Sequence, residues 1–308
     1  RRWPKVLLGL VLVFVLLVAL APYLLSTGPA TRAIVNAINE RIQGRVALAD
    51  LSVGWTGPIE LRDIVVTDPD GREVIRAERA SLGTSLLALL RSPTHFGQIE
   101  IHGPRADLYL EPGRPLSLAR AFESRTPSPS EGPLPDVRGK VVIRSGKVRV
   151  IPQDAPAYEV RQIDGTFDLD SLTHLTAAVE ALPPGDGKLI TEIDVNGLVK
   201  DDQFVLTTAR GTFKVRTTGP VDAGAIVALL APESQTAGLC TLDATGDFQD
   251  GRIDANLAAE VRELRTQGSR ATPIQPINLR LAGRVGGTQS DVSGDLTLEG
   301  EPGRVATK

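Results

Sequence analysis

The chain has 308 residues, which is enough for two ordinary domains or one elongated domain. Its formal net charge is −3, with 23% charged residues. This balance argues against nucleic acid as a partner, because proteins that bind nucleic acid concentrate basic residues on one face. A single cysteine, Cys240, excludes an intrachain disulfide and a cysteine metal cage. We interpret it as a small buried apolar residue.

The first expected element is a membrane-spanning helix. Residues 6–25 are almost entirely Val, Leu, Ala and Phe, a run long enough to cross a hydrocarbon core of about 30 Å. Basic residues before this run predict a cytoplasmic N-terminus with the rest of the chain on the far side, and aromatic rings at both ends suit the membrane interface. The flanking residues of the anchor are Arg1, Arg2, Trp3, Lys5 and Tyr23.

A cleaved signal peptide is the alternative, since Ala19-Leu20-Ala21 has the small-x-small form of a cleavage site. The apolar run is longer than the usual core of a signal peptide, and Pro22 would follow the cut directly. Both points favour the anchor, and both interpretations place the body outside the cytoplasm. The chain begins at Arg1, contains no methionine and ends on a strand-like repeat without a cap, so we expect a fragment of a longer protein.

Helical patterns are few. A short amphipathic helix is expected over residues 29–44, where Ile34, Ile38 and Ile42 recur at four-residue spacing. It would either pack on the following sheet or lie along the membrane surface. Two further short helices are expected at residues 85–91 and 221–230.

Beyond Gly44 the hydrophobic period changes to two, which is typical of half-buried strands joined by tight polar turns. Asp68 and Asp70 lie in one such turn with a proline and a glycine in suitable positions. We interpret them as turn residues, because a calcium loop needs further carboxylates at fixed spacing. Further turns are predicted at residues 144–147, 200–203, 249–251 and 286–287. The pattern gives on the order of sixteen strands, which would extend roughly 70 Å at a strand spacing of about 4.8 Å.

The predicted fold class is therefore mainly β. An N-terminal transmembrane helix precedes an elongated antiparallel β-sheet meander, an open, taco-like groove with a few short helices. The predicted organisation is a cytoplasmic stub and anchor at 1–25, a helix plus β module at 26–122, a Pro/Ser-rich linker or loop at 123–138, and repeating β-hairpins at 139–308, which we expect to continue beyond the fragment.

No pattern of catalytic residues is present in the sequence. The segment Gly185-Asp186-Gly187-Lys188 lacks the upstream glycine and the following hydroxyl of a phosphate-binding loop, and neither a Gly-x-Ser-x-Gly elbow nor a His-Glu-x-x-His helix occurs. The three histidines, His95, His102 and His174, are scattered. We expect no enzymatic activity, no cofactor and no metal.

The first part of the chain resembles the AsmA-like superfamily, which includes the TamB-type proteins of diderm bacteria. The resemblance covers roughly residues 1–112, and the rest is similar only to the β-repeats of that family. It is carried by the order of the anchor, the helix up to Gly44, and the segments 44–46, 51–55, 57–61, 65–71, 85–90 and 97–104. The linker at 123–138 departs from a compact repeat.

The resemblance implies a single-pass inner-membrane protein with a cytoplasmic N-terminus and its body in the periplasm. The family is implicated in outer-membrane biogenesis and in phospholipid movement between membranes, and its architecture is similar to that of bridge-like lipid-transfer proteins with β-grooves. Its implied partners are phospholipids, the membrane and an outer-membrane assembly protein.

A sheet with one apolar face needs a second sheet, helices or a ligand to cover it. Our first hypothesis is that this face shields phospholipid acyl chains. The second is a non-enzymatic assembly or scaffold factor for outer-membrane proteins, with a closed β core that holds partners by its edges or loops. The candidate lipid-facing residues are Val141, Ile143, Val148, Val150, Phe167, Leu169, Ile193, Val195, Ile253, Leu257, Leu279 and Leu281.

Overall fold

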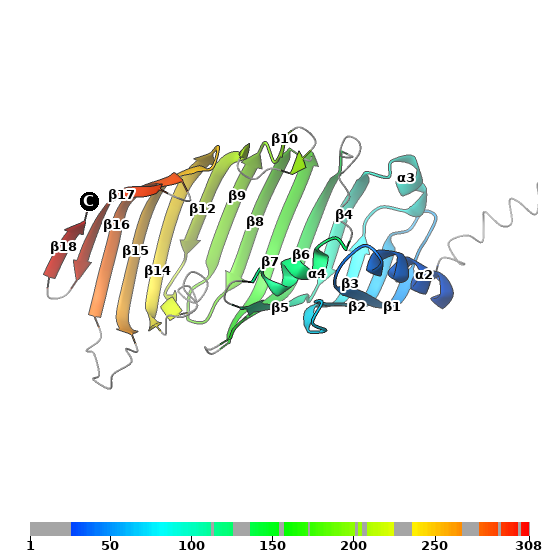
Figure 1. Ribbon diagram of the computed structural model, residues 1–308, viewed down its shortest axis with the longest axis horizontal. Helices are drawn as coiled ribbons and strands as arrows, with labels where there is room; N and C mark the ends of the chain where they lie inside the picture. The colour runs from blue at the N-terminus through cyan, green and yellow to red at the C-terminus, as the bar shows by residue number, and fades with distance from the viewer. Residues whose placement is uncertain are drawn as a thin grey trace, which may run out of the picture.

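One long, twisted sheet makes up most of the protein (Figure 1). The computed structural model describes residues 26–111, 114–125, 136–153, 157–171, 173–200, 203–204, 208–224, 236–266, 277–288, 291–300 and 303–307. Sixteen strands join in this sheet, and β10 and β11 form a separate two-stranded sheet. The expectation of a mainly β protein with a long antiparallel meander is confirmed.

Three helices and eighteen strands carry labels within the described residues. The helices are α2 (Gly28–Asn39), α3 (Leu86–Arg91) and α4 (Ser117–Phe122). The strands are β1 (Arg45–Ser52), β2 (Ile59–Thr67), β3 (Glu73–Leu82), β4 (His95–His102), β5 (Arg105–Leu110), β6 (Arg138–Pro152), β7 (Tyr158–Ser171), β8 (His174–Leu182), β9 (Leu189–Asn196), β10 (Val199–Lys200), β11 (Gln203–Phe204), β12 (Arg210–Thr217), β13 (Val221–Asp222), β14 (Thr236–Gln249), β15 (Arg252–Thr266), β16 (Ile277–Thr288), β17 (Asp291–Gly300) and β18 (Gly303–Thr307).

Most strands pair with their neighbours in the sequence, as tight turns require. The order along the sheet is β1-β2-β3-β4-β6-β7-β8-β9-β12-β14-β15-β16-β17-β18. These fourteen positions extend about 60 Å at the usual strand spacing. The predicted turn after β2 is present: the Gly71 amide donates to the Asp68 carbonyl at 3.0 Å.

The pairing of β4 and β5 with β6 is parallel, unlike the rest of the main sheet. The two strands lie in line beside the longer β6, and on their other side they pair with β3 in one unbroken register. A parallel neighbour requires the chain to cross over to the same end of the sheet. The connection from β5 to β6 contains α4 and the proline-rich segment, so the sheet is continuous across the predicted linker.

Two predicted turns are wrong. Residues 144–147 lie inside the single long strand β6, and residues 286–287 lie inside β16. At the first position the backbone of Ser145 has a positive φ of 53°, and the pairing of β6 with β7 shifts there. Such a bulge bends a strand without ending it, which explains why Ser and Gly resembled a turn.

The helices differ from expectation in their extent. α2 ends at Asn39 rather than continuing to Gly44, because the Asn39 side chain accepts from the Val46 amide at 2.6 Å and donates to its carbonyl at 3.0 Å. The helix expected at residues 221–230 starts with strand β13, and a helical turn begins at Ala223; residues 225–230 lie outside the described ranges. The helix expected at residues 85–91 is present as α3, and the structure adds that Ser85 caps it, its Oγ accepting from the Ala88 amide at 3.3 Å.

No helix within the described ranges is both long and apolar enough to cross a membrane. The expected anchor, residues 6–25, with its flanking residues, lies outside those ranges.

The hydrophobic core is thin. Sixteen hydrophobic side chains are buried among the described residues; seven of them are alanine, and none is isoleucine or phenylalanine. The main sheet therefore forms an extended layer whose large hydrophobic side chains stay only partly covered.

Candidate functional site

The two faces of the sheet differ in character from β6 to β17. Residues directly opposite each other on paired strands share a face, and the faces alternate along each strand. One transverse row consists of Val141, Phe167, Ala177, Ile193, Phe213, Gly246, Ala255, Val285 and Gly294. The next row on that face consists of Ile143, Gly165, Val179, Thr191, Val215, Ala244, Leu257, Gly283 and Leu296. No residue in these two rows is charged, and we call this side the apolar face.

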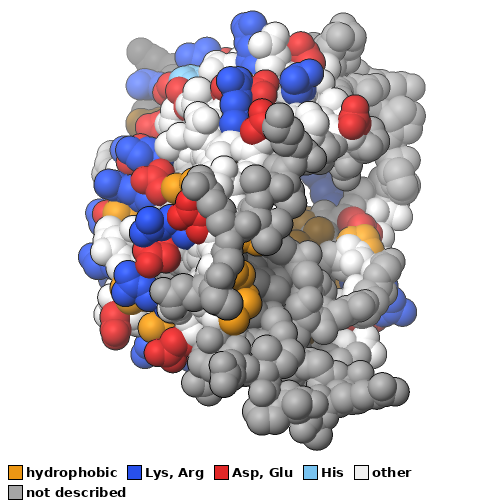
Figure 2. Space-filling view, turned by 90° about the vertical axis from the view of Figure 1, so that its left-hand side faces the viewer, with side chains coloured by type: hydrophobic (Ala, Val, Ile, Leu, Met, Phe, Trp, Pro, Cys, Tyr) orange, Lys and Arg blue, Asp and Glu red, His pale blue; other side chains and the backbone are white. Residues whose placement is uncertain are grey.

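The opposite side, the polar face, carries the charges. The row adjacent to the first apolar row consists of Lys140, Asp168, Thr176, Asp194, Thr212, Asp247, Asp254, Gly286 and Ser293. Figure 2 looks along the sheet from its β18 end. It shows acidic and basic side chains crowded on one outer side of the molecule, and hydrophobic side chains within the hollow behind that wall. The sheet thus separates a solvated surface from an apolar one.

All twelve candidate lipid-facing residues lie on the apolar face. For ten of them this follows from regular alternation along β6, β7, β9, β15 and β16. Val148 and Val150 come after the bulge in β6. Beyond the bulge, Gly146 pairs with Ile163, which lies two residues from Gly165 and therefore on the apolar face. Val148 and Val150 alternate with Gly146 along the strand, so they lie on the apolar face as well. Val150 and Val195 are buried, Ile253 is 50% exposed, and the others are half-buried. Their contact with lipid remains a prediction.

Two aromatic rings of the apolar face lie across glycines of the neighbouring strand. A Cβ placed on Gly246 of β14 would come within 2.9 Å of the Phe213 ring of β12. One placed on Gly211 of β12 would come within 2.9 Å of the Phe248 ring of β14. Each ring therefore lies across a glycine on the neighbouring strand, an arrangement that fills the gap left by the missing side chain. The alternating pattern did not identify these glycines as part of the face.

At the N-terminal end of the sheet, α2 and α4 lie across the same side of the strands (Figure 1). Ala121 of α4 is fully buried with Val66 and Val74, and Leu118 and Tyr109 pack against this cluster. The Gly44 amide donates to the Ala121 carbonyl at 2.9 Å. A side chain at Gly44 would collide with Ala121, whose Cα would lie 3.0 Å from its Cβ, so the glycine is required where the chain passes α4.

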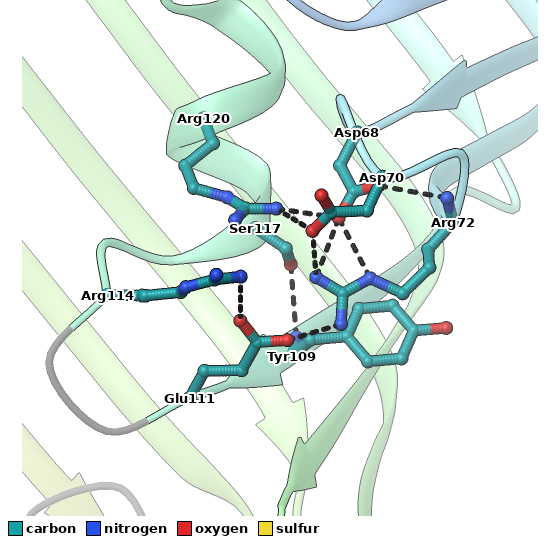
Figure 3. A network of polar contacts seen from close by, with 8 residues as sticks. All are labelled: Asp68, Asp70, Arg72, Tyr109, Glu111, Arg114, Ser117 and Arg120. Atoms are coloured by element: carbon teal, nitrogen blue, oxygen red, sulfur yellow. Dashed lines mark hydrogen bonds and ion pairs between the residues drawn. The ribbon is translucent and has the colours of Figure 1, made fainter.

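A group of charged side chains fixes α4 in place; we call it the α4 clamp. Figure 3 shows the guanidinium of Arg72 between the turn after β2 and the end of β5, with the Tyr109 ring beside it. Its Nη2 lies 2.9 Å from Asp68 Oδ2, its Nη1 lies 2.6 Å from Glu111 Oε1, and its Cζ lies 4.5 Å from the ring centroid. The members of the clamp are Asp68, Asp70, Arg72, Glu111, Arg114 and Arg120.

Arg120 is the contribution of α4 to the clamp. Its Nη2 donates to Asp68 Oδ2 at 3.3 Å and to Asp70 Oδ2. Its partner Asp70 has a pKa below the ordinary value, chiefly because of this hydrogen bond, and the Arg72 hydrogen bond lowers the pKa of Glu111. Three carboxylates face three guanidinium groups, so the clamp is neutral and leaves little charge for a metal ion or an ionic substrate. Asp68 and Asp70 thus hold arginines as well as a turn.

Two histidines outside the α4 clamp, His102 and His174, lie beside carboxylates. His174 bridges two carboxylates on the polar face, with Nε2 3.2 Å from Asp194 Oδ1 and Nδ1 3.3 Å from Asp170 Oδ2. His102 lies 3.6 Å from Glu100. Cys240 is buried, as expected, and burial raises the pKa of its thiol. Within the described ranges, no three His, Cys, Asp or Glu side chains come together as metal ligands would.

A shallow depression of about 570 Å³ lies on the polar face over β6 to β12. Charged side chains on its rim include Lys140, Asp168, Asp194 and Lys214, with threonine and alanine on its floor. Acidic and basic groups are mixed on its rim. We therefore regard the apolar face, rather than this depression, as the candidate functional site.

The chain matches no protein-family model, no curated protein and no solved structure.

Proposed function

We propose that this protein is a membrane-anchored, periplasmic protein of outer-membrane biogenesis. Its apolar face would form an open groove that shields phospholipid acyl chains during transport between membranes. The observation that carries the proposal is the apolar face, whose two central rows carry no charge across nine strands from β6 to β17. At the usual strand spacing this distance is about 40 Å. One leaflet of a bilayer contributes about 15 Å of hydrocarbon, so the face is longer than an acyl chain.

The energetics support a lipid as the covering group. An acyl chain in water exposes methylenes at about 0.8 kcal/mol each, or about 12 kcal/mol for sixteen carbons. Contact with an apolar wall removes much of this barrier without a catalytic group. The half-buried Ile, Leu and Phe side chains of the face are stabilised by the same contact, because the thin core leaves part of their apolar surface in water and a bound acyl chain would cover it.

The membrane anchor is the second part of the proposal. The apolar run at residues 6–25 and the basic residues before it predict one transmembrane span with a cytoplasmic N-terminus. The resemblance of residues 1–112 to the AsmA-like superfamily favours the inner membrane and the periplasm. A passive conduit lowers a barrier without setting a direction, so no nucleotide site is needed.

The test is lipid capture by the full chain purified from membranes in mild detergent. Native mass spectrometry and lipid extraction measure the bound phospholipid. Leu257→Asp places a carboxylate on the apolar face between Ala244 and Gly283, the small residues opposite it on the neighbouring strands. Ala258→Asp is the matched control, since it adds the same charge one residue later on the exposed polar face.

Leu257→Asp should weaken lipid capture about 30-fold. The loss of one leucine contact is worth about 2 kcal/mol, and each 1.4 kcal/mol is a factor of about ten in affinity. Ala258→Asp should retain lipid like the unmodified protein. Equal lipid retention by both variants would contradict the proposal.

The alternative function is an assembly factor that pairs a partner strand with a sheet edge. The observation in its favour is β1, which pairs only with β2 among the described strands and presents exposed residues along its length. An unpaired edge is a template for an added strand. A stably folded protein that copurifies without phospholipid would favour this function.

A further inference from the structure

The short helix α3 presents leucines to the outside. Leu87 is 41% exposed and Leu90 is 67% exposed, the largest exposed fraction among the large hydrophobic residues described. These two residues are three apart and share one side of the helix, whereas Leu86 and Leu89 are half-buried on another. Arg91, in the last turn, is also exposed. α3 therefore combines an outward apolar side with a basic residue.

Hydrogen bonds hold α3 close to the point where the predicted anchor joins the body. The Val53 amide donates to the Ser26 Oγ at 3.0 Å. One residue later, the carbonyl of Gly54 accepts from the Leu86 amide at 3.2 Å, and that of Trp55 accepts from the Leu87 amide at 3.3 Å. The loop after β1 thus links Ser26 to the first turn of α3. Figure 1 shows α3 at the same end of the sheet as α2.

This connection limits the distance between α3 and the membrane. The predicted span ends at Leu25, next to Ser26. The path from Ser26 through the Val53 and Gly54 hydrogen bonds to the first turn of α3 is at most about 15 Å long. The interfacial layer of a bilayer is about 5–8 Å thick on each side. The first turn of α3 therefore begins within about 15 Å of the end of the predicted span, near the headgroup layer of the membrane that the span crosses.

We propose that α3 docks on this membrane, with Leu87 and Leu90 at the boundary between headgroups and acyl chains and Arg91 on lipid phosphates. The inference rests on the anchor of the proposed function. Such placement is typical of amphipathic helices with leucines on one side and basic residues at the rim. Docking would fix the N-terminal end of the sheet against the bilayer.

The small size of the patch favours a membrane over a protein partner. Two leucines and an arginine provide far less than the roughly 1,000 Å² that a specific protein interface needs. A membrane contact needs less, because the anchor already holds α3 at a high effective concentration at the bilayer surface. A second copy of the chain would have to form a stable contact from the patch alone.

The experiment places an environment-sensitive fluorophore on single cysteines of the full chain in a Cys240→Ala background. The chain is reconstituted in phosphatidylcholine–phosphatidylglycerol vesicles, and quenching by brominated phospholipid is measured. The test position is Leu87→Cys. The matched control is Leu239→Cys, because Leu239 is also 41% exposed but lies on β14, far along the sheet from α3. A second control, Asp295→Cys, reports on a charged, exposed position of β17.

Lipid quenching at least threefold stronger for the Leu87 label than for both controls is the expected result. A second variant, Leu90→Asp, should reduce that quenching to the level of the controls while the chain stays in the vesicles. Equal quenching at all three positions, with the chain still in the vesicles, would overturn the docking of α3 and leave the anchor intact.

If the chain is lost from the vesicles after an alkaline wash, the anchor fails and the inference fails with it. Docking without phospholipid in lipid extracts would support the role of α3 and count against the proposed shielding of acyl chains. The two proposals are therefore distinguishable.

Discussion

Removal of the buried carboxylate of the α4 clamp should release α4. Asp68 has a fully buried side chain. It accepts from the Arg72 backbone amide at 2.9 Å and from Arg72 Nε at 3.0 Å, and it also binds Arg120 at 3.3 Å. Asp68→Ala removes all of these acceptors at once and leaves buried donors of both arginines with fewer partners.

The expected cost follows from burial. Breaking a buried ion pair by removal of one partner costs about 3–5 kcal/mol, and we expect the lower value because Asp70 and Glu111 continue to hold the two arginines. A loss of about 3 kcal/mol lowers the melting temperature by about 6–12 °C in a protein of this size class. Circular dichroism gives the melting temperature, and limited trypsin digestion at Arg120 reports the release of α4.

Asp70→Ala is the control, since Asp70 binds the same two arginines but its side chain is 46% exposed. Water replaces the lost contacts of an exposed carboxylate, so its melting temperature should stay close to that of the unmodified protein. A melting temperature for Asp68→Ala within 1 °C of the unmodified protein would refute the reasoning. Equal losses for the two variants would show that burial is not the cause.

Three further predictions concern single features of the structure. The pKa of Glu111 is lowered, so its contribution to stability is fully present above its unfolded pKa of about 4.3 and is lost as the pH falls through its lower folded value. The melting temperature, measured from pH 7 to pH 3, should therefore decrease once the pH is below about 4. The decrease should be smaller in Glu111→Gln. Gly246→Ala should lower the free energy of unfolding in urea by about 1–3 kcal/mol, because its Cβ would lie 2.9 Å from both the Phe213 ring and Ala255 Cα. Gly57→Ala is the control: no heavy atom lies within 4 Å of the added Cβ, so the free energy of unfolding should change little. The raised pKa and burial of Cys240 predict slow labelling by a maleimide at pH 7 that accelerates on addition of urea; rapid labelling of the folded protein would contradict the burial.

The helix ends illustrate how local signals succeed and fail. The short helix expected at residues 85–91 is present as α3, and its Ser85 cap is a local contact between residues three positions apart. α2 ends at Asn39 because the Asn39 side chain accepts a hydrogen bond from the Val46 amide in the next strand. The helical spacing of the isoleucines carries no information about this contact. α4 was missed, because its six residues lack a side-chain cap and owe their position to Arg120 and Ala121.

The sequence by itself determined that this protein is a meander of strands with one apolar side. A period of two is a local property of the backbone, so alternation in β6, β7 and β9 was sufficient to place Val141, Phe167 and Ile193 on one face. The turn chemistry after β2 was equally local. These features need no knowledge of distant residues.

The tertiary structure decided how these strands are arranged. The parallel pairing of β4 and β5 with β6 depends on a crossover, and the bulge at Ser145 becomes a bulge only because β7 pairs across it. The α4 clamp joins Asp68 to Arg120 across 52 residues. The loop after β1 joins Ser26 to α3. Contacts between distant segments arise from packing, and a single sequence carries no periodic signal for them.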